Sequence, residues 1–219
     1  ELGWKLTVEK FEKENHLGKK SYVDLKDTIY DEAAIALSEL NVLSGYEDGT
    51  FRTEKALTRA EFVTVVMRLI TPGKETPENN ADKMFFSDVT VNHWAFDNIS
   101  AAAELGLIGG FGDSRFYPDN PVTYNQAVKM LVCALGYGQQ GEKKGGYPYG
   151  YLLEAIELGI TKSVTARFEN NINRGIMLLL VNNSLDIPMK NDGITPRQIK
   201  SGVYATYYVS PDGSDDNPG

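Results

Sequence analysis

The feature that most constrains this chain is a helix-ending signal that occurs three times. A glutamate and a leucine are followed by Asn or Gly and then by an apolar residue, at 39–42, 104–107 and 157–160. Asn and Gly readily enter the left-handed conformation that ends many helices, and the apolar residue beyond them commonly packs back on the helix. Three copies of this signal predict three related helical units. Since such a unit cannot bury its apolar face alone, the units must pack against one another.

A helix-start signal predicts a second helix in each unit. Thr58 and Glu61, and likewise Thr123 and Gln126, have the spacing of a capping box, in which each residue bonds the other's backbone amide. Asn173 is a competent N-cap without that partner. Apolar residues follow at helical spacing in each copy: Phe62, Val65, Val66, Leu69 and Ile70; Ala127, Met130, Leu131, Ala134 and Leu135; Met177, Leu180, Val181 and Leu185. Three such stripes predict an all-α fold around a three-helix bundle with pseudo-threefold symmetry.

The two helices of a unit are joined by a glycine-rich loop in the first two copies. The loops read GYEDGTF at 45–51 and GFGDSRF at 110–116. Glycine permits a tight path, and the aromatic residues can fix the loop to the body of the protein. We expect Asp48 and Asp113 to make local turn hydrogen bonds, because the alternating carboxylates of a calcium loop are missing. The third unit has lost this loop.

Changes in composition divide the chain into six segments. They are an N-terminal extension 1–20, a first unit 21–72, a linker 73–83, a second unit 84–137, a degenerate third unit 138–190 and a C-terminal extension 191–219. The stretch 136–150 is also interpreted as a linker because it is rich in glycine. Alternating apolar residues at 203–209 predict a short β-strand that leaves the array.

Composition argues against several classes of function. A net charge of −8 and a pI near 4.9 disfavour nucleic-acid binding, which requires a basic face. No apolar segment approaches the length of a membrane span. His16 and His93 are isolated from any metal-ligand spacing, and Cys133 lies in an apolar run typical of a core. No nucleophile–base pair or phosphate loop is apparent, so we expect a non-enzymatic segment without cofactor or metal.

The motifs of the first two units resemble the S-layer homology module. They are FSDV at 86–89, HWA at 93–95 and AELGLIGGFGD at 103–113 in the second unit, and GYEDGTF with TRAE at 58–61 in the first. The resemblance covers residues 20–190 and implies three modules in a pseudo-trimeric all-α spindle. It also implies a secreted cell-surface protein, held to the wall by non-covalent binding of secondary cell-wall polysaccharide, often through a pyruvylated sugar, in grooves between modules. From Tyr207 onward the chain resembles the start of right-handed β-helix domains of polysaccharide-acting proteins, which implies fusion to such a domain.

The residues themselves favour capture of an anion. A capped helix N-terminus presents free amides and partial positive charge, and Arg59 adds a guanidinium suited to a carboxylate such as a pyruvyl ketal. Alternatively, Arg59 pairs with Glu61 or Glu54 at the surface. In the second copy Tyr124 replaces the arginine, although its ring could stack on a sugar. The third copy keeps Arg174 but lacks the glycine loop, so the sequence predicts one competent groove, lined by Arg59, and two doubtful ones.

Trp94 has two interpretations, a core residue at the start of a helix or a platform for a sugar ring. The candidate polysaccharide-binding residues are Gly45, Asp48, Thr58, Arg59, Trp94, Gly110, Tyr124 and Arg174. Two other functions remain open at this stage. The repeats could have lost their ligand and serve as a structural or lattice module, or they could anchor a polysaccharide-acting enzyme whose chemistry lies in another domain.

Overall fold

The computed structural model describes residues 21–72 and 83–202. The helices are α2 (Asp31–Glu39), α3 (Arg59–Ile70), α4 (Phe96–Glu104), α5 (Tyr124–Ala134), α6 (Gly138–Lys143), α7 (Tyr149–Leu158), α8 (Arg174–Ser184) and α9 (Pro196–Ser201). Within the described ranges, β-type pairing is limited to isolated bridges. The prediction of an all-α fold is confirmed.

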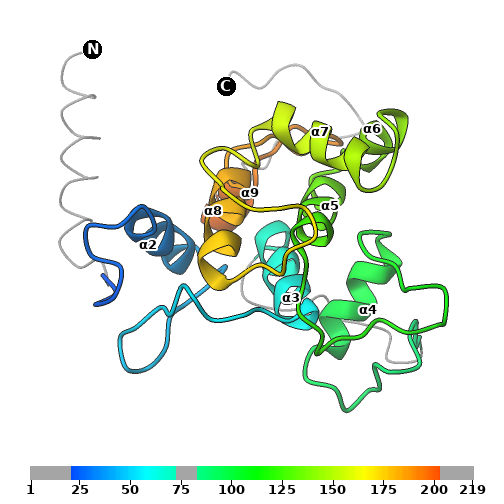
Figure 1. Cartoon of the computed structure of the whole chain (residues 1–219), viewed down its shortest axis with the longest axis horizontal. Helices are drawn as coiled ribbons and strands as arrows, with labels where there is room; N and C mark the ends of the chain where they lie inside the picture. Colours follow the sequence, from blue (N-terminus) through cyan, green and yellow to red (C-terminus); the bar gives the residue numbers. More distant parts are fainter. Residues whose placement is uncertain (1–20, 73–82, 203–219) are drawn as a thin grey trace, which may run out of the picture.

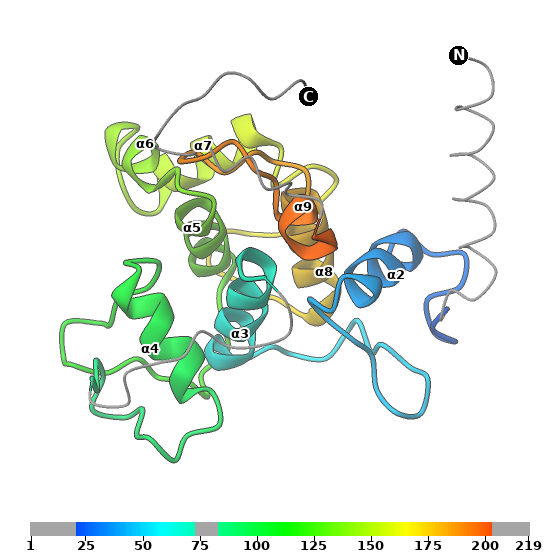
Figure 2. The same ribbon diagram turned by 180° about the vertical axis from the view of Figure 1, so that it is seen from behind.

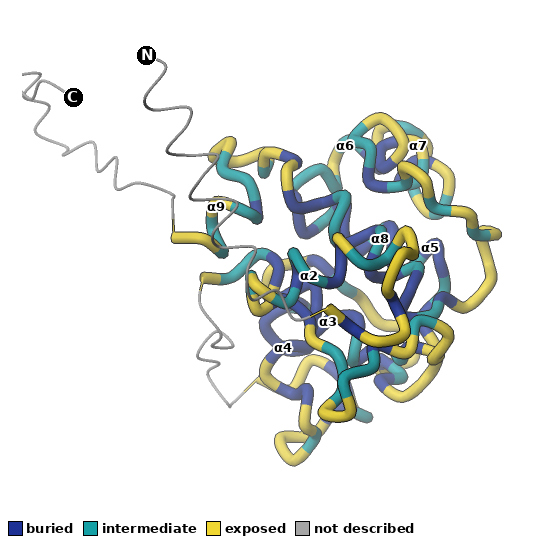
Figure 3. Tube along the Cα trace, turned by 90° about the vertical axis from the view of Figure 1, so that its left-hand side faces the viewer, coloured by how far each residue is buried: buried dark blue, intermediate teal, exposed yellow. Residues whose placement is uncertain are grey.

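The centre of the fold is formed by α3, α5 and α8, which contact one another in all three pairs (Figure 1). In Figure 3 buried residues, drawn dark blue, occur along these helices. The apolar stripes predicted for them lie in the core, with only Ile70 partly exposed. Helix α3 is buried on most of its surface rather than along a single stripe, because α4, α5, α8 and α9 all contact it.

The first helix of each repeat packs on the second helix of the repeat before it. Helix α4 contacts α3, and α7 contacts α5. Helix α2 of the first repeat contacts α8 of the third, as Figure 2 shows from behind. The order of contacts therefore runs from the first repeat through the third and back to the first. The predicted spindle shape stays a prediction, whereas this cyclic order of contacts is observed.

Backbone hydrogen bonds follow the same cyclic order. The first two amides of each central helix donate to carbonyl groups in the loop of the next repeat. The pairs are Arg59 with Asn120 and Ala60 with Pro118, both at 2.9 Å, Tyr124 with Asn170 at 2.9 Å and Asn125 with Phe168 at 3.2 Å, and Arg174 with Lys55 at 3.0 Å and Gly175 with Thr53 at 2.9 Å. These amides would otherwise lack partners within the helix, so the helix starts join the repeats.

The three predicted helix ends are confirmed. Asn41, Gly106 and Gly159 have φ values of 55°, 70° and 83°, all in the left-handed region. The next residue in each copy then donates its amide at 2.9 Å to a carbonyl in the last turn of the helix. This is the 6→1 bond that accompanies such helix ends, and it directs each chain into the loop that follows.

The stretch 136–150, interpreted above as a linker, is largely helical. It contains α6, and α7 begins at Tyr149. Two glycines let these helices approach closely: a Cβ on Gly141 would lie 2.8 Å from the Tyr151 ring, and one on Gly150 would lie 2.1 Å from the Gly141 carbonyl oxygen. Tight packing therefore overrides the low helix propensity of glycine.

The C-terminal extension also begins with a helix, α9, which the sequence reading missed. Its signal is a capping box of Thr195 and Gln198 with proline at the first helical position. A bidentate ion pair fixes α9, because Arg197 donates to the Asp186 carboxylate at 2.6 and 2.9 Å. The strand predicted at 203–209, the extension 1–20 and the β-helix-like tail lie outside the described residues. No helix in the described ranges is long and apolar enough to cross a membrane.

Candidate functional site

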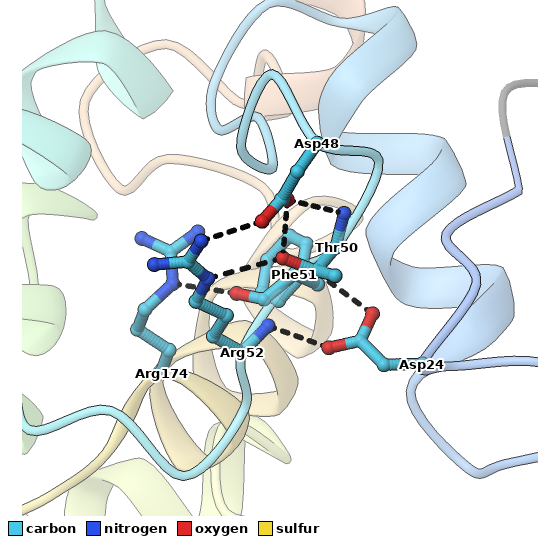
Figure 4. A network of polar contacts seen from close by, with 6 residues as sticks. All are labelled: Asp24, Asp48, Thr50, Phe51, Arg52 and Arg174. Atoms are coloured by element: carbon cyan, nitrogen blue, oxygen red, sulfur yellow. Dashed lines mark hydrogen bonds and ion pairs between the residues drawn. The ribbon is translucent and has the colours of Figure 1, made fainter.

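An aspartate ahead of the first helix holds the glycine-rich loop in both repeats that have one. Asp24 accepts hydrogen bonds from the amides of Phe51 and Arg52, both at 2.8 Å (Figure 4). In the second repeat the same two bonds join Asp88 to the amides of Phe116 and Tyr117, at 2.8 and 2.7 Å. The two loops are therefore held at matching positions.

The loop glycines Gly45 and Gly110 are required by close packing. A Cβ on Gly45 would lie 2.2 Å from the Tyr22 ring, and one on Gly110 would lie 2.7 Å from the Arg115 carbonyl oxygen. The Gly45 amide donates to the Tyr22 hydroxyl at 2.9 Å. The Gly110 amide has no such partner among the described residues, since Phe86 stands in place of the tyrosine.

Asp48 shapes the turn of the first loop, as predicted. It accepts bonds from the Thr50 amide at 3.0 Å, the Thr50 hydroxyl at 2.6 Å and the Arg52 guanidinium at 2.6 Å (Figure 4). These contacts, the Thr50 hydroxyl first, lower the pKa of Asp48 to about 2. Asp113 likewise accepts from the Arg115 amide and the Tyr117 hydroxyl. Asp48 lines neither of the two grooves described below.

Arg59 is buried against the loop of the second repeat rather than its own. Its side chain is 3% exposed, Nε donates to the Phe116 carbonyl at 2.9 Å, and the guanidinium carbon lies 4.3 Å from the Phe116 ring centroid and 4.8 Å from that of Phe111. Burial lowers its pKa to about 10, so the group is charged at neutral pH. The alternative that Arg59 pairs with Glu61 or Glu54 at the surface is wrong, because Arg59 is buried. Glu61 instead accepts from the Thr58 amide at 2.8 Å, and Glu54 accepts from the Asn173 side chain at 3.1 Å.

Arg174 makes the equivalent contacts with the loop of the first repeat. Its Nε donates to the Phe51 carbonyl at 3.0 Å (Figure 4). Its Nη2 donates to the Ser44 carbonyl, also at 3.0 Å. The sequence predicts a doubtful Arg174 groove because the third repeat lacks a glycine loop, whereas Arg174 contacts the complete loop of the first repeat. Neither Arg59 nor Arg174 forms an ion pair with a carboxylate in the part of the chain that the structure describes.

The free helix amides expected at the anion site are not present. The first two amides of α3 are bonded to the next loop, and the third, of Glu61, donates to the Thr58 hydroxyl at 3.2 Å. Thr58 therefore acts as a helix cap. An anion at this site would be held by the guanidinium.

Arg59 opens onto a cavity of about 230 Å³, here called the Arg59 groove. It is lined by Arg59, Leu107, Ile108, Gly109, Gly110, Phe111, Gln126, Lys129, Met130 and Tyr147. All three repeats contribute, since Arg59 comes from the first, the loop and α5 from the second, and Tyr147 from the third. The Lys129 ammonium lies 5.5 Å from the Tyr147 ring centroid, so the groove combines two cations with aromatic and aliphatic walls.

Arg174 opens onto a second cavity of about 170 Å³, here called the Arg174 groove. It is lined by Leu43, Ser44, Leu57, Glu61, Thr64, Val65, Arg68, Trp94 and Arg174. A cavity of about 360 Å³, lined by Ser38, Asn41, Leu43, Ser44 and Arg68, shares three of these residues. The two grooves are built in the same way. Each combines an arginine from one central helix, the loop and central helix of the next repeat, and an aromatic residue of the repeat after that.

Trp94 is a surface residue rather than a core residue. It is 61% exposed and stacks on His93 with ring centroids 5.8 Å apart. Tyr147 holds the same place in the Arg59 groove, since both residues directly precede the N-cap of a first helix. The sequence reading missed Tyr147, Lys129 and Arg68, although an aromatic residue just before the first helix in two repeats could have identified Tyr147.

The third inter-repeat position, where the start of α5 meets the loop of the third repeat, differs from these two grooves. Tyr124 stands in place of the arginine; it is buried, at 4% exposed, and lines neither of the two grooves. Ala166 stands seven residues before the N-cap, where the other repeats have Phe51 and Phe116. The Asn183 amide donates to the carbonyls of Ile160 and Lys162 at 3.0 and 2.8 Å.

Comparison with known proteins assigns the family of the first two repeats. The model of the S-layer homology domain matches residues 21–63 and 85–128. The first two repeats are S-layer homology domains. The chain is 33% identical over 169 residues to a cell surface protein of Thermoanaerobacter kivui, and 34% identical over 154 residues to the middle cell wall protein of Brevibacillus brevis. It is 27% identical over 158 residues to the cellulosome-anchoring protein of Acetivibrio thermocellus.

These alignments cover 77%, 70% and 66% of the chain but only 22%, 14% and 35% of the three relatives. The chain thus spans a minor part of the length of the curated proteins that it matches. The predictions of S-layer homology and of a cell-surface location are confirmed. A third S-layer homology module and a β-helix tail stay predictions.

Proposed function

We propose that this chain anchors a larger protein to the bacterial cell wall by non-covalent binding of an acidic wall polysaccharide. The observation that carries the proposal is the pair of buried guanidinium groups, Arg59 and Arg174, each without a carboxylate partner in the described structure and each lining a groove. A buried charge without a partner is unfavourable. A carboxylate on the ligand, such as that of a pyruvylated sugar, supplies the missing partner with directional hydrogen bonds.

The rest of each groove is suited to a sugar. Tyr147 and Trp94 offer exposed aromatic faces beside the two arginines. Because each groove takes residues from all three repeats, bound polymer contacts the whole array. This arrangement suits an anchor, and any catalytic activity of the full-length protein then belongs to another part of it.

Sedimentation with purified wall sacculi tests the proposal. We expect the protein to pellet with intact sacculi and to stay in solution once the secondary polysaccharide has been extracted. Arg59→Gln should weaken binding at least tenfold, because a charge-assisted contact is lost. Arg115→Gln is the matched control. Arg115 is an exposed arginine of the 110–116 loop that Arg59 contacts, and it lies outside the groove. This variant should bind like the wild type. Equal pelleting with intact and extracted sacculi would contradict the proposal.

A further inference from the structure

A second cavity adjoins the Arg174 groove and is here called the Asn41 cavity. Its volume is about 360 Å³, and it is lined by Ser38, Asn41, Leu43, Ser44 and Arg68, the last three of which also line the groove. We propose that the Asn41 cavity binds the hydroxyl groups of the sugar residue next along the polymer to the one held in the Arg174 groove. The inference rests on the proposed function and extends it by one sugar.

The size and the position of the Asn41 cavity suit such a neighbouring sugar. Its volume falls within the range of about 300–1,000 Å³ that is typical of small-molecule sites. Since Leu43, Ser44 and Arg68 belong to both linings, the groove and the cavity are continuous. A polymer chain that leaves the groove on this side therefore passes directly into the cavity.

Three polar side chains of the cavity are available to a ligand. Asn41, Ser44 and Arg68 are exposed, and their side chains form no hydrogen bond or ion pair within the described ranges. Together they offer an amide, a hydroxyl and a guanidinium, which can donate to and accept from sugar hydroxyls. Because Arg68 lines both spaces, its guanidinium can contact both sugars.

The fourth polar side chain, Ser38, is already held in place. The Tyr22 hydroxyl lies 2.7 Å from the Ser38 hydroxyl and accepts from the Gly45 amide at 2.9 Å. This chain of hydrogen bonds fixes the Ser38 oxygen at the wall of the cavity before any ligand arrives. In the second repeat Phe86 stands in place of Tyr22 and has no hydroxyl to do the same.

The polar lining is particular to the Arg174 side when the first two repeats are compared. At the equivalent positions the second repeat has residues with no polar side chain or only a thiol: Ala103 for Ser38, Gly106 for Asn41, Gly109 for Ser44 and Cys133 for Arg68. A thiol is only a weak hydrogen-bond donor. The two grooves are thus alike, but only the Arg174 groove continues into a polar lining of this kind.

Asn41 separates the needs of the fold from those of a ligand. It has a φ of 55° at the end of the first helix, where the other two repeats have Gly106 and Gly159 with φ values of 70° and 83°. Glycine enters this left-handed region more readily than asparagine, because it has no Cβ. The helix end therefore does not require the Asn41 amide, and Asn41→Gly removes that amide while keeping the backbone.

The test compares two probes on this variant. Both are prepared as methyl glycosides from the wall polysaccharide of the source organism: its acidic sugar alone, and the same sugar with its neighbours along the polymer. The parent protein is Arg59→Gln, so that binding in the Arg59 groove contributes little. Calorimetry gives both affinities for the parent and for each variant, and thermal melting verifies the fold.

We expect Asn41→Gly to lower affinity for the longer probe about three- to tenfold, the effect of one hydrogen bond, and to leave affinity for the single sugar unchanged. Arg68→Ala should weaken binding of both probes, because Arg68 lines both spaces. Ser163→Gly is the matched control. Ser163 is another exposed residue in the left-handed region, with a φ of 59°, and it lies outside both linings, so this variant should bind like the parent.

Two results would overturn the inference while leaving the proposed function intact: an unchanged affinity of Asn41→Gly for the longer probe, or an equal loss for both probes. Failure of the wild type to bind either probe would overturn the proposed function, and this inference with it.

Discussion

The Arg59 and Arg174 grooves and the third inter-repeat position start from the same local geometry. At all three, a central helix donates its first two amides to the loop of the next repeat. At the grooves an arginine then lies over a loop phenylalanine, with centroid distances of 4.3 and 4.6 Å. At the third position Tyr124 replaces the arginine and Ala166 the phenylalanine, while Asn183 bonds to loop carbonyls.

Under the proposed function, joining the repeats and binding a ligand use separate parts of one motif. The backbone bonds between repeats persist at the third position although the arginine and the glycine loop are gone. The third position therefore keeps the bonds that join the repeats, whereas the other two add a buried guanidinium that lines a groove. Substitutions at the third position should therefore lower stability without affecting binding, whereas substitutions of equivalent groove residues should weaken binding with little change in stability.

The largest effect is expected for Tyr124→Ala. Truncating this buried ring should lower the free energy of unfolding by about 3–5 kcal/mol, through lost burial and the cavity left behind, with no loss of wall binding by the folded protein. Arg59→Met, at the equivalent position, should change stability by less than about 1 kcal/mol, because removal of an unpaired buried charge offsets the lost hydrogen bond. It should also weaken wall binding.

Urea unfolding and sedimentation with sacculi measure the two properties separately. Tyr124→Phe is the control, since it keeps the ring and should leave both properties close to wild type. Weaker wall binding by folded Tyr124→Ala would mean that the third position also contacts ligand, and the contrast between the positions would fail.

The next effect concerns the loop that the third repeat has lost. Gly110→Ala should lower the free energy of unfolding by about 2–3 kcal/mol, because the new Cβ meets the Arg115 carbonyl at 2.7 Å and the Phe86 ring at 3.2 Å. Gly109→Ala is the matched control, since nothing lies within 4 Å of its Cβ, and its stability should be unchanged. Equal unfolding curves for the two variants would show that the loop can shift to accommodate a side chain.

Much of the fold could be predicted because its signals are local. The caps at Thr58 and Thr123 and the left-handed residues Asn41, Gly106 and Gly159 depend on neighbours within a few residues, and all were confirmed. Helix α6 was missed because its stability depends on the close contact of Gly141 with Tyr151, a tertiary interaction that helix propensity does not reveal. Helix α9 carried a local capping signal that was overlooked.

The site was harder to predict because it is assembled across repeats. Sequence proximity assigned Arg59 to the loop at 45–51, whereas the cyclic packing places it with the loop at 110–116. Arg174 appeared to lack a loop for the same reason. Residue type alone could not show that Tyr124 is buried and Trp94 exposed, since both assignments depend on which helix covers them.

Asn183 offers a smaller test of the comparison. Asn183→Ala removes both side-chain bonds to the carbonyls of Ile160 and Lys162 and should lower the free energy of unfolding by about 1–2 kcal/mol without affecting wall binding. Arg68 occupies the equivalent helical position in the Arg174 groove. Arg68→Ala should leave stability nearly unchanged and weaken wall binding. If Asn183→Ala weakened wall binding as much as Arg68→Ala does, the contrast between the third position and the grooves would be contradicted.

The smallest effect is a difference in acid sensitivity between the loops. Asp48 has a pKa lowered to about 2 by the Thr50 hydroxyl and then by Arg52, against an unfolded value near 3.8. Its stabilising contribution is therefore present above pH 4 and is lost as the pH falls toward 2. Asp48→Asn should be slightly less stable than the wild type at pH 7, with a deficit that shrinks as the pH falls from 4 through 2. Glu47→Gln removes a neighbouring carboxylate that makes none of these bonds, so its stability should follow the wild type throughout. A deficit of Asp48→Asn that stays constant from pH 7 to pH 2 would mean that the side-chain geometry of Asp48, rather than its charge, holds the loop.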